Sequence, residues 1–244
     1  MKYDYKKEFI LHYSEIDSSA HFSLVSCLNY IQNMSTEYFQ TMKIDNFTLS
    51  TLDNAVWVIT KTKLKFLKRP VWKDKIIIRI YTTKISAIRY HVEIAFEDEN
   101  GECIILAKQE YCAMDIATRK ARKIASIHFP VDLEAEVEKY PEEYRHLRDE
   151  FEEASYIYSQ KIGSQDIDFS KHTNNVVYVR YLMNLFTCKE LETMEIDNFE
   201  IHYLAESKEG QILKIYKKSV AEKEWTFLIR DEEREIARAY IAFQ

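Results

Sequence analysis

The residues best suited to chemistry lie close together in the stretch DIDFSKHTNNVVYVRYLMN, Asp166–Asn184. Asp168 and His172 are four positions apart, so a carboxylate and an imidazole could anchor one hydrogen-bond network. Asn174 or Asn175 precedes an apolar run and is a favourable N-cap, so the following helix presents unpaired N–H groups and its positive dipole end. Such a helix start can polarise a carbonyl oxygen, which becomes more anionic as its carbon is attacked.

A second stretch, EIDSSAHFSLVSCLNYIQN at Glu15–Asn33, repeats this pattern 151 positions earlier (168 − 17 = 151). TMKIDNF at Thr41–Phe47 then recurs as TMEIDNF at Thr193–Phe199, offset by 152 (193 − 41 = 152), which implies one inserted residue between the blocks. A repeat of this length predicts two fused homologous domains, because solenoid periods are far shorter. The residues that coincide in the first block are Ile16, Asp17, Ser19, His21, Val25, Tyr30 and Asn33 with Ile167, Asp168, Ser170, His172, Val176, Tyr181 and Asn184.

Composition excludes several function classes. The chain has 244 residues, 46% of them hydrophobic, which is enough apolar surface for two modest domains. Only three glycines occur, so glycine-rich phosphate loops are absent and ATP and NAD are not expected ligands. The four cysteines lack the short spacing of metal sites, and no metal or organic cofactor is predicted. A formal charge of −6 argues against nucleic acid as a partner but allows a local basic patch.

The sequence predicts a cytoplasmic protein that does not enter a membrane. The first residues, MKYDYKKEFILHY, are charged throughout and lack the apolar core of a signal peptide. No apolar window approaches the length of a membrane span.

The periodicity of each copy predicts one long helix followed by antiparallel strands. Apolar residues from Leu24 to Met42 recur at a spacing near 3.6, and the second helix is expected from Asn174 or Asn175 to Leu191. Val56–Phe66 alternates, with Lys61, Lys63 and Lys65 on its exposed side. The other expected strands are 75–83, 89–97 and 103–114, with a hairpin turn at Asn100-Gly101, and, in the second copy, strands near 198–207, 211–219, 224–230 and 235–243.

These elements predict an α+β protein made of two tandem domains, each a long helix wrapped by a curved antiparallel sheet. The expected divisions are residues 1–126, a linker at 127–155 that is rich in acidic residues, and residues 156–244. This architecture resembles the double hot-dog fold.

Three segments resemble the acyl-acyl-carrier-protein thioesterase family. DIDFSKHTNNVVYVRYLMN is similar to that family's aspartate, asparagine, histidine and paired-asparagine motif. RPVWKDKIIIRIYTT at Arg69–Thr83 and MDIATRKARKI at Met114–Ile124 resemble two further family segments, in the family's order. The resemblance covers nearly the whole chain and implies the double hot-dog fold and hydrolysis of a thioester.

The resemblance also implies the site residues. The family's catalytic aspartate falls on Asp168, its histidine on His172 and its glutamate on Glu206. Ser170 stands where the family motif has asparagine, and Ser207 where plant members often have cysteine. The substitution at position 207 matters little for a reaction without a thiolate, whereas Ser170 leaves the shape of the polar network open.

In such a site, Glu206 would activate water or attack the thioester directly, and the water route is preferred. Asn174 and Asn175 would bind the substrate carbonyl at the helix start, and His172 would protonate the leaving thiolate. The first copy has Lys68-Arg69-Pro70 in place of Ala205-Glu206-Ser207 by approximate alignment. We therefore expect one working site, in the second copy, with the first copy forming a wall for the acyl chain. Asp17, Ser19 and His21 are interpreted as a capped helix start retained from the duplication.

The predicted function is hydrolysis of fatty acyl-acyl carrier protein, which releases a free fatty acid and ends chain elongation. The partner is acyl carrier protein bearing an acyl-phosphopantetheine, received by the basic cluster at Arg119–Lys123 or by the strand lysines. Alternatives are an acyl-CoA thioesterase on the same fold and a non-catalytic acyl-binding protein; a dehydratase is less compatible with a single carboxylate-bearing copy. Monomer and homodimer both remain open.

Overall fold

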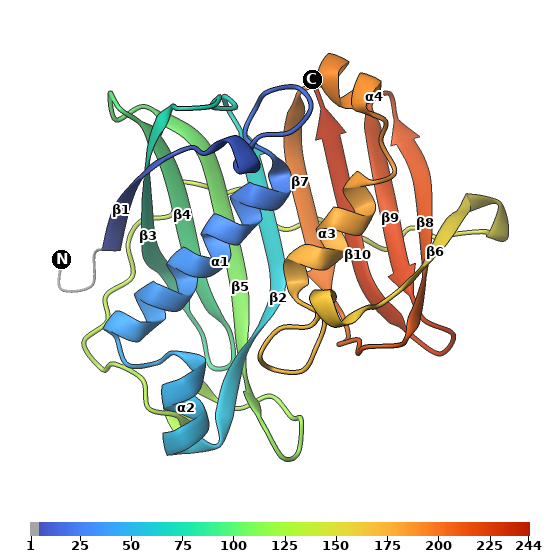
Figure 1. The fold of residues 1–244 in the computed structure, drawn as a ribbon. Helices are drawn as coiled ribbons and strands as arrows, with labels where there is room; N and C mark the ends of the chain where they lie inside the picture. Colours follow the sequence, from blue (N-terminus) through green and yellow to red (C-terminus); the bar gives the residue numbers. More distant parts are fainter. Residues whose placement is uncertain (1–4) are drawn as a thin grey trace. The chain divides into compact units, whose positions relative to one another are not determined.

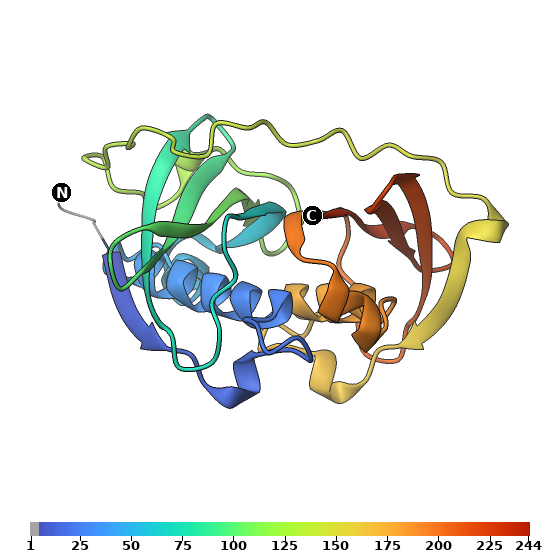
Figure 2. The same cartoon turned by 90° about the horizontal axis from the view of Figure 1, so that it is seen from above.

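The computed structural model describes residues 5–244, which form two compact units, one ending at Glu142 and one spanning Glu143–Gln244. In each unit a helix lies against a curved antiparallel sheet (Figures 1 and 2). The α+β architecture with two copies of a helix-and-sheet layer, predicted from the sequence, is confirmed.

The long helix of the first unit is α1, Leu24–Thr41. It begins at Ser23, whose hydroxyl accepts a hydrogen bond from the Ser26 N–H and so satisfies one of the unpaired donors at the helix start. The face expected from the 3.6-residue spacing is the buried one, and the predicted helix is confirmed. The buried apolar residues of α1 are Leu24, Cys27, Leu28, Ile31, Met34, Tyr38 and Phe39.

The first sheet has the strand order β1-β3-β4-β5-β2, and its neighbouring strands are antiparallel. The four strands predicted for this copy are confirmed, and Gly101 adopts a φ of +82° in the turn between β4 and β5, a conformation that glycine tolerates without strain. Strand β1, which pairs with β3, was not predicted. The strand bounds are β1 Tyr5–Ile10, β2 Ala55–Phe66, β3 Lys75–Ile85, β4 Tyr90–Asp98 and β5 Cys103–Asp115.

The second sheet has the order β7-β10-β9-β8-β6, again antiparallel between neighbours. Its strands β7 to β10 lie near the predicted ranges, although β7 ends at Tyr203 and not near Ser207, and β6 was not predicted. The bounds are β6 Tyr156–Lys161, β7 Ile196–Tyr203, β8 Ile212–Ala221, β9 Glu224–Arg230 and β10 Glu235–Phe243.

The second helix is shorter than predicted. Helix α3 covers Asn175–Met183, and a separate helix α4 covers Cys188–Thr193. The single helix expected to reach Leu191 is therefore wrong. Thr187 starts α4 anew, because its hydroxyl accepts from the Glu190 N–H while the Glu190 carboxylate accepts from the Thr187 N–H. A capping box of this kind favours a helix start at a position that periodicity alone treats as helix interior.

The two copies of the TM-x-IDNF segment adopt different structures. In the first copy Asp45 caps helix α2, Asn46–Asp53, by accepting the N–H groups of Phe47 and Thr48. In the second copy the same residue types enter strand β7 from Ile196 onward. The prediction that this match continues the repeat at an offset of 152 is wrong.

The strands show the true offset. The N–H groups of Leu67 and Lys68 donate to the Ile104 carbonyl, as those of Leu204 and Ala205 donate to the Ile236 carbonyl. These equivalences give an offset of 137 (204 − 67 = 137), so the second copy is 14 residues shorter between helix and strand (151 − 137 = 14). The eight residues of α2 and their connections account for the longer first copy.

The segment that follows the first domain lies on the side of the sheet away from α1 (Figure 2). Lys108 on β5 donates to the Glu138 carboxylate at 3.1 Å and to the Tyr140 carbonyl at 3.0 Å. The Glu93 carboxylate on β4 accepts the N–H groups of Lys139 and Tyr140 at 2.8 and 3.1 Å. Buried charges on the outer sheet surface thus hold this stretch of the predicted linker.

Because this segment covers the outer surface of the sheet, the interpretation of one strand lysine changes. Lys63 is buried, forms an ion pair with Glu142 at 3.2 Å and lies 5.3 Å from the Tyr140 ring centre. The expectation that Lys63 belongs to a solvent-exposed strand surface is therefore wrong. Lys61 is half-buried and pairs with Glu110 at 3.6 Å.

Candidate active site

The polar stretch ahead of α3 forms a tight loop held at its base by Asp166. The Asp166 carboxylate accepts the Gly163 N–H at 2.9 Å and the Tyr181 hydroxyl at 2.7 Å, and it pairs with Arg180. Burial raises the pKa of Asp166, but these hydrogen bonds and the Arg180 charge outweigh that effect, and the pKa lies below its usual value. Asp166 therefore anchors the loop as a carboxylate.

The start of α3 matches the predicted cap. Asn174 is the N-cap, and its side-chain oxygen accepts the Val176 N–H at 2.9 Å. The Val177 N–H donates to the Asn174 carbonyl. Within residues 5–244, the Asn175 N–H has no protein acceptor, and Asn175 is only half-buried. One N–H of the first helical turn thus remains available to a ligand oxygen.

His172 and Glu206, which are 34 positions apart, meet in space. His172 Nε2 lies 3.2 Å from Glu206 Oε2, and their side chains are 24% and 35% exposed. His172 comes from the loop before α3, and Glu206 from the turn after β7. The pair is therefore partly shielded but still reachable from solvent.

The turn that carries Glu206 is fixed on both sides. The Ala205 N–H donates to the Ile236 carbonyl, and Arg234 donates to the Glu206 carbonyl at 2.8 Å. Farther along, Gly210, with a φ of +85°, donates its N–H to the Ile162 carbonyl. The backbone around position 206 is thus held by β10 and by the turn that precedes it.

Asp168 and Ser170 form a second pair within the loop. The Asp168 carboxylate accepts the Ser170 N–H at 2.9 Å and the Ser170 hydroxyl. The Asp168 N–H donates to the His172 carbonyl at 3.0 Å, and Lys171 adopts a φ of +68°. Asp168 and Ser170 therefore shape the loop that presents His172.

The first copy builds the same loop. The Asp17 N–H donates to the His21 carbonyl at 2.8 Å, and the Asp17 carboxylate accepts from Ser19. The Phe22 N–H donates to the Pro70 carbonyl, as the Thr173 N–H donates to the Ser207 carbonyl. These bonds make Arg69 the counterpart of Glu206, in agreement with the approximate alignment.

Arg69 gives the first loop a different charge arrangement. Its guanidinium forms an ion pair with Asp17 and donates to the Phe22 carbonyl at 3.0 Å, and its side chain is 3% exposed. His21 Nδ1 lies 2.8 Å from the Ser19 carbonyl oxygen. The pairing of imidazole with carboxylate seen in the second copy is thus replaced by a buried arginine–aspartate pair.

Three residues beside the site were not assigned a role from the sequence. Ser207 is fully buried, and its hydroxyl lies 2.8 Å from both Thr173 Oγ1 and the Tyr178 hydroxyl. The sequence signal was weak, because a serine after a strand and a tyrosine within an apolar helix are common residues in common places.

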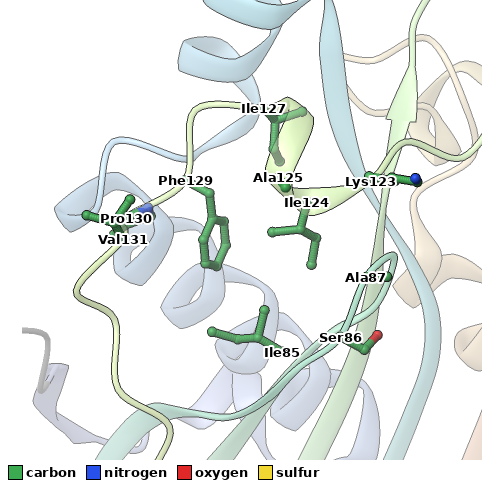
Figure 3. A pocket seen from close by; sticks show the side chains of 10 residues that line it. All are labelled: Ile85, Ser86, Ala87, Lys123, Ile124, Ala125, Ile127, Phe129, Pro130 and Val131. Atoms are coloured by element: carbon green, nitrogen blue, oxygen red, sulfur yellow. The ribbon is translucent and has the colours of Figure 1, made fainter.

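An apolar pocket of about 490 Å³ lies in the first unit, between the β3–β4 connection and the segment after β5 (Figure 3). Phe129 lines it and packs against Tyr90 and Trp57, with ring centres 5.4 and 6.3 Å apart. The lining residues are Ile85, Ser86, Ala87, Lys123, Ile124, Ala125, Ile127, Phe129, Pro130 and Val131.

Within residues 5–244, no group of three or more His, Cys, Asp and Glu side chains could hold a metal ion. No helix in the same range is long and apolar enough to cross a membrane.

Two family models match nearly the entire chain. The acyl-ACP thioesterase N-terminal domain matches residues 2–127, and the acyl-ACP thioesterase C-terminal domain matches residues 150–244. Plant relatives include the chloroplastic acyl-[acyl-carrier-protein] hydrolase FATB1 of Cuphea viscosissima, 19% identical over 85% of this chain, and a palmitoyl-acyl carrier protein thioesterase of Arabidopsis thaliana, 22% identical over 86%. The chain spans about half the length of these two relatives, 52% and 53%.

Solved structures share the fold over the full length. An acyl-ACP thioesterase from Bacteroides thetaiotaomicron superposes with a TM-score of 0.90 at 19% identity, covering 99% of this chain and 98% of that one. The 12:0-ACP thioesterase from Umbellularia californica gives a TM-score of 0.81 at 16% identity, covering 99% and 97%. The predicted double hot-dog fold is confirmed by this likeness.

Proposed function

Because the chain belongs to the acyl-ACP thioesterase family, we propose that it hydrolyses the thioester of a fatty acyl-acyl carrier protein and releases a free fatty acid. The observation that carries this proposal is the contact of 3.2 Å between His172 and Glu206. The two residues belong to different elements, and an imidazole beside a carboxylate forms a proton-transfer pair that can serve hydrolysis.

In the reaction that we propose, Glu206 removes a proton from a water molecule, and the water oxygen attacks the thioester carbonyl carbon. The carbon–sulfur bond then breaks, and the sulfur leaves as a thiolate. His172 protonates that sulfur, and the proton held by Glu206 reaches His172 across their contact. The proton thus passes from water to sulfur, and both side chains return to their starting states.

Asn175 and Asn174 are proposed to bind the substrate carbonyl. The Asn175 N–H, which has no acceptor among residues 5–244, supplies a hydrogen-bond donor to the oxygen that gains charge. Asn174 caps the helix and so keeps that N–H in place. The positive end of the α3 dipole adds to the same stabilisation.

Asp168 and Ser170 are proposed to hold the catalytic loop rather than to take part in proton transfer. Their mutual hydrogen bonds and the Asp168 N–H bond to the His172 carbonyl support this role. The serine hydroxyl thereby supplies a donor to the aspartate at the position where the family has asparagine.

The partner proposed is acyl carrier protein, whose acidic surface would meet the basic cluster at the end of β5. Arg119, Lys120 and Lys123 are exposed there, whereas Arg122 is tied to the carbonyls of Asp53 and Ser126. Exposed like charges raise the rate of encounter with an acidic protein at low salt. A cytoplasmic place of action and a monomeric or homodimeric state belong to the same proposal.

A direct test compares acyl carrier protein and coenzyme A thioesters of the same acyl chains, over a series of chain lengths. We expect release of free fatty acid with a higher kcat/KM on the carrier-protein substrate. Lys120→Glu with Lys123→Glu should raise KM for that substrate and leave acyl-CoA turnover unchanged. A preference for acyl-CoA would overturn the partner, and binding without release would support an acyl-binding protein instead.

A further inference from the structure

A buried cluster of three hydroxyl groups lies directly behind the His172–Glu206 pair. Thr173, Tyr178 and Ser207 are 5%, 2% and 0% exposed. Ser207 Oγ lies 2.8 Å from Thr173 Oγ1 and 2.8 Å from the Tyr178 hydroxyl oxygen, and Thr173 Oγ1 donates to the Ser207 carbonyl at 3.1 Å. These side chains are too buried to touch substrate, so any role must be exerted through their neighbours.

The three hydroxyls can be satisfied in one consistent direction. A hydroxyl carries one proton and donates once. Since Thr173 gives its proton to the Ser207 carbonyl, it accepts from the Ser207 hydroxyl, which in turn accepts from Tyr178. Each member of such a chain polarises the next, and Ser207 is the member that connects the other two.

The cluster joins the two segments that carry the catalytic pair. Thr173 directly follows His172, and Ser207 directly follows Glu206. Thr173 donates both its N–H and its hydroxyl to the Ser207 carbonyl, at 2.9 and 3.1 Å. Tyr178 fixes Ser207 to helix α3. A shift of Ser207 would therefore move Glu206 relative to His172.

The first copy shows whether the loop needs these three hydroxyls in order to fold. By the offsets of 151 and 137 derived above, the counterparts of Thr173, Tyr178 and Ser207 are Phe22, Cys27 and Pro70. The backbone bond is kept, from the Phe22 N–H to the Pro70 carbonyl at 2.7 Å, but no hydroxyl remains at any of the three positions. The loop of the first copy thus folds without these hydroxyls. They occur only in the second copy, which has Glu206 where the first has Arg69.

We infer that Ser207, linked to Thr173 and Tyr178, is a positioning residue that sets the separation of Glu206 and His172. This inference rests on the proposed hydrolase function. It assigns Ser207 a role that does not depend on nucleophilic reactivity, since its oxygen is fully buried and occupied by hydrogen bonds.

The test measures kcat and KM on acyl-acyl carrier protein for Ser207→Ala, Thr173→Val and Tyr178→Phe. Ser207→Ala should lower kcat about tenfold with KM unchanged, because it removes both hydrogen bonds of the Ser207 hydroxyl and leaves the buried Tyr178 hydroxyl without an acceptor. Thr173→Val should have a smaller effect and Tyr178→Phe the smallest, since the remaining two hydroxyls can still pair. Ser207→Cys keeps a proton-bearing atom and should restore kcat to within about threefold of the wild type.

Tyr240→Phe is the matched control, because Tyr240 is buried in the same unit and donates to Glu224 at 2.6 Å away from the site. It should lower stability but leave kcat unchanged. If Ser207→Ala affects kcat no more than Tyr240→Phe does, the positioning role is wrong.

A second readout separates this inference from the hydrolase function itself. The ring-nitrogen NMR signals of His172 should shift in Ser207→Ala and not in Tyr240→Phe, whether or not the protein turns over acyl carrier protein thioesters. Wild-type protein that hydrolyses no acyl thioester refutes the proposed function. Unchanged His172 signals in Ser207→Ala overturn the positioning of the pair.

Discussion

The loop before α1 and the loop before α3 have the same backbone hydrogen bonds and opposite charge arrangements. Both place an aspartate at the start, a residue with positive φ in the turn and a histidine before the helix. They differ in charge in the segment that each loop contacts, where the first copy has Arg69-Pro70 and the second has Glu206-Ser207. The shared backbone shows that the loop folds in the same way whether position 69 carries a cation or position 206 a carboxylate.

The opposite charges of Arg69 and Glu206 decide which side chains meet in each copy. In the first copy the Arg69 guanidinium is drawn to the Asp17 carboxylate and is buried there. In the second copy the Asp168 carboxylate also accepts from its serine, as Asp17 does from Ser19, but Glu206 lies against His172. In the proposed reaction the carboxylate and the imidazole of the second copy transfer the proton, whereas the guanidinium of Arg69 keeps its own proton.

The largest effect is expected from removing the carboxylate. Glu206→Gln keeps the size of the side chain but cannot accept a proton, so kcat on acyl-acyl carrier protein should fall about 10³-fold. Arg69→Gln is the matched change in the first copy and should leave kcat within about twofold, since general-base catalysis needs no group there. Steady-state hydrolysis assays on both variants check this. Equal losses in the two would mean that the copies do not differ in function.

Replacing the two equivalent histidines, His172 and His21, should likewise affect kcat only in the second copy. His172→Ala removes the partner of Glu206 and should lower kcat about 10²-fold, because one proton-transfer group is lost. His21→Ala should leave kcat unchanged, since His21 contacts Ser19 in the copy without the carboxylate. Hydrolysis measured beside thermal unfolding distinguishes catalysis from stability. A loss of rate in His21→Ala alone would transfer the active site to the first copy.

The first copy should instead respond in stability. Arg69→Ala leaves Asp17 without its ion pair in a partly buried place, so we expect a loss of about 2–3 kcal/mol in the free energy of unfolding. Arg180→Ala is the control in the second copy, because Arg180 also pairs with an aspartate but is 48% exposed, and its loss should be below about 1 kcal/mol. Urea unfolding measures both. Similar losses in the two variants would refute a structural role specific to Arg69.

Local sequence patterns predicted most of the fold. The 3.6-residue spacing in α1 reflects burial of one helix face, and the apolar runs of the strands reflect burial in the sheets, so both are encoded locally. The edge strands β1 and β6 were missed, because KKEFI and IYSQK carry too many polar residues to stand out. The end of α3 was missed because a capping box at Thr187 overrides an apolar pattern that continues past it.

The site residues also fall into those that local sequence predicts and those that it does not. Asp168, Ser170, His172, Asn174 and Asn175 lie within one stretch, so their proximity follows from the sequence itself. The contact between His172 and Glu206 needed a family resemblance, because nothing local links residues 34 positions apart. The hydrogen bonds among Thr173, Tyr178 and Ser207 could not be predicted, since they depend on tertiary packing; the sequence marked only position 207, as a departure from the family. The TM-x-IDNF match was misleading for the same reason: seven similar residues cap a helix in one context and enter a strand in the other.

The smallest effect concerns Asp166, the anchor of the second loop. Burial raises the pKa of its carboxyl, but the Gly163 N–H, the Tyr181 hydroxyl and Arg180 together hold that pKa below its usual value. The ionised form therefore stabilises the fold above about pH 4, the pKa of an unfolded aspartate, and this contribution is lost as the pH falls from there toward the lowered pKa. Tyr181→Phe removes one of the bonds that favour the ionised form. Its cost in unfolding free energy should thus be largest near neutral pH and should shrink in acid.

Tyr158→Phe is the matched control for Tyr181→Phe, because Tyr158 donates to the uncharged carbonyl of Tyr181 at 2.8 Å. Its cost should stay constant over the same acid range, since its acceptor does not titrate there. Urea unfolding of both variants from neutral pH to below about pH 4 makes the comparison. If the two costs run parallel at every pH, the Tyr181 hydroxyl does not act through the charge of Asp166, and the loop before α3 would be held by neutral hydrogen bonds alone.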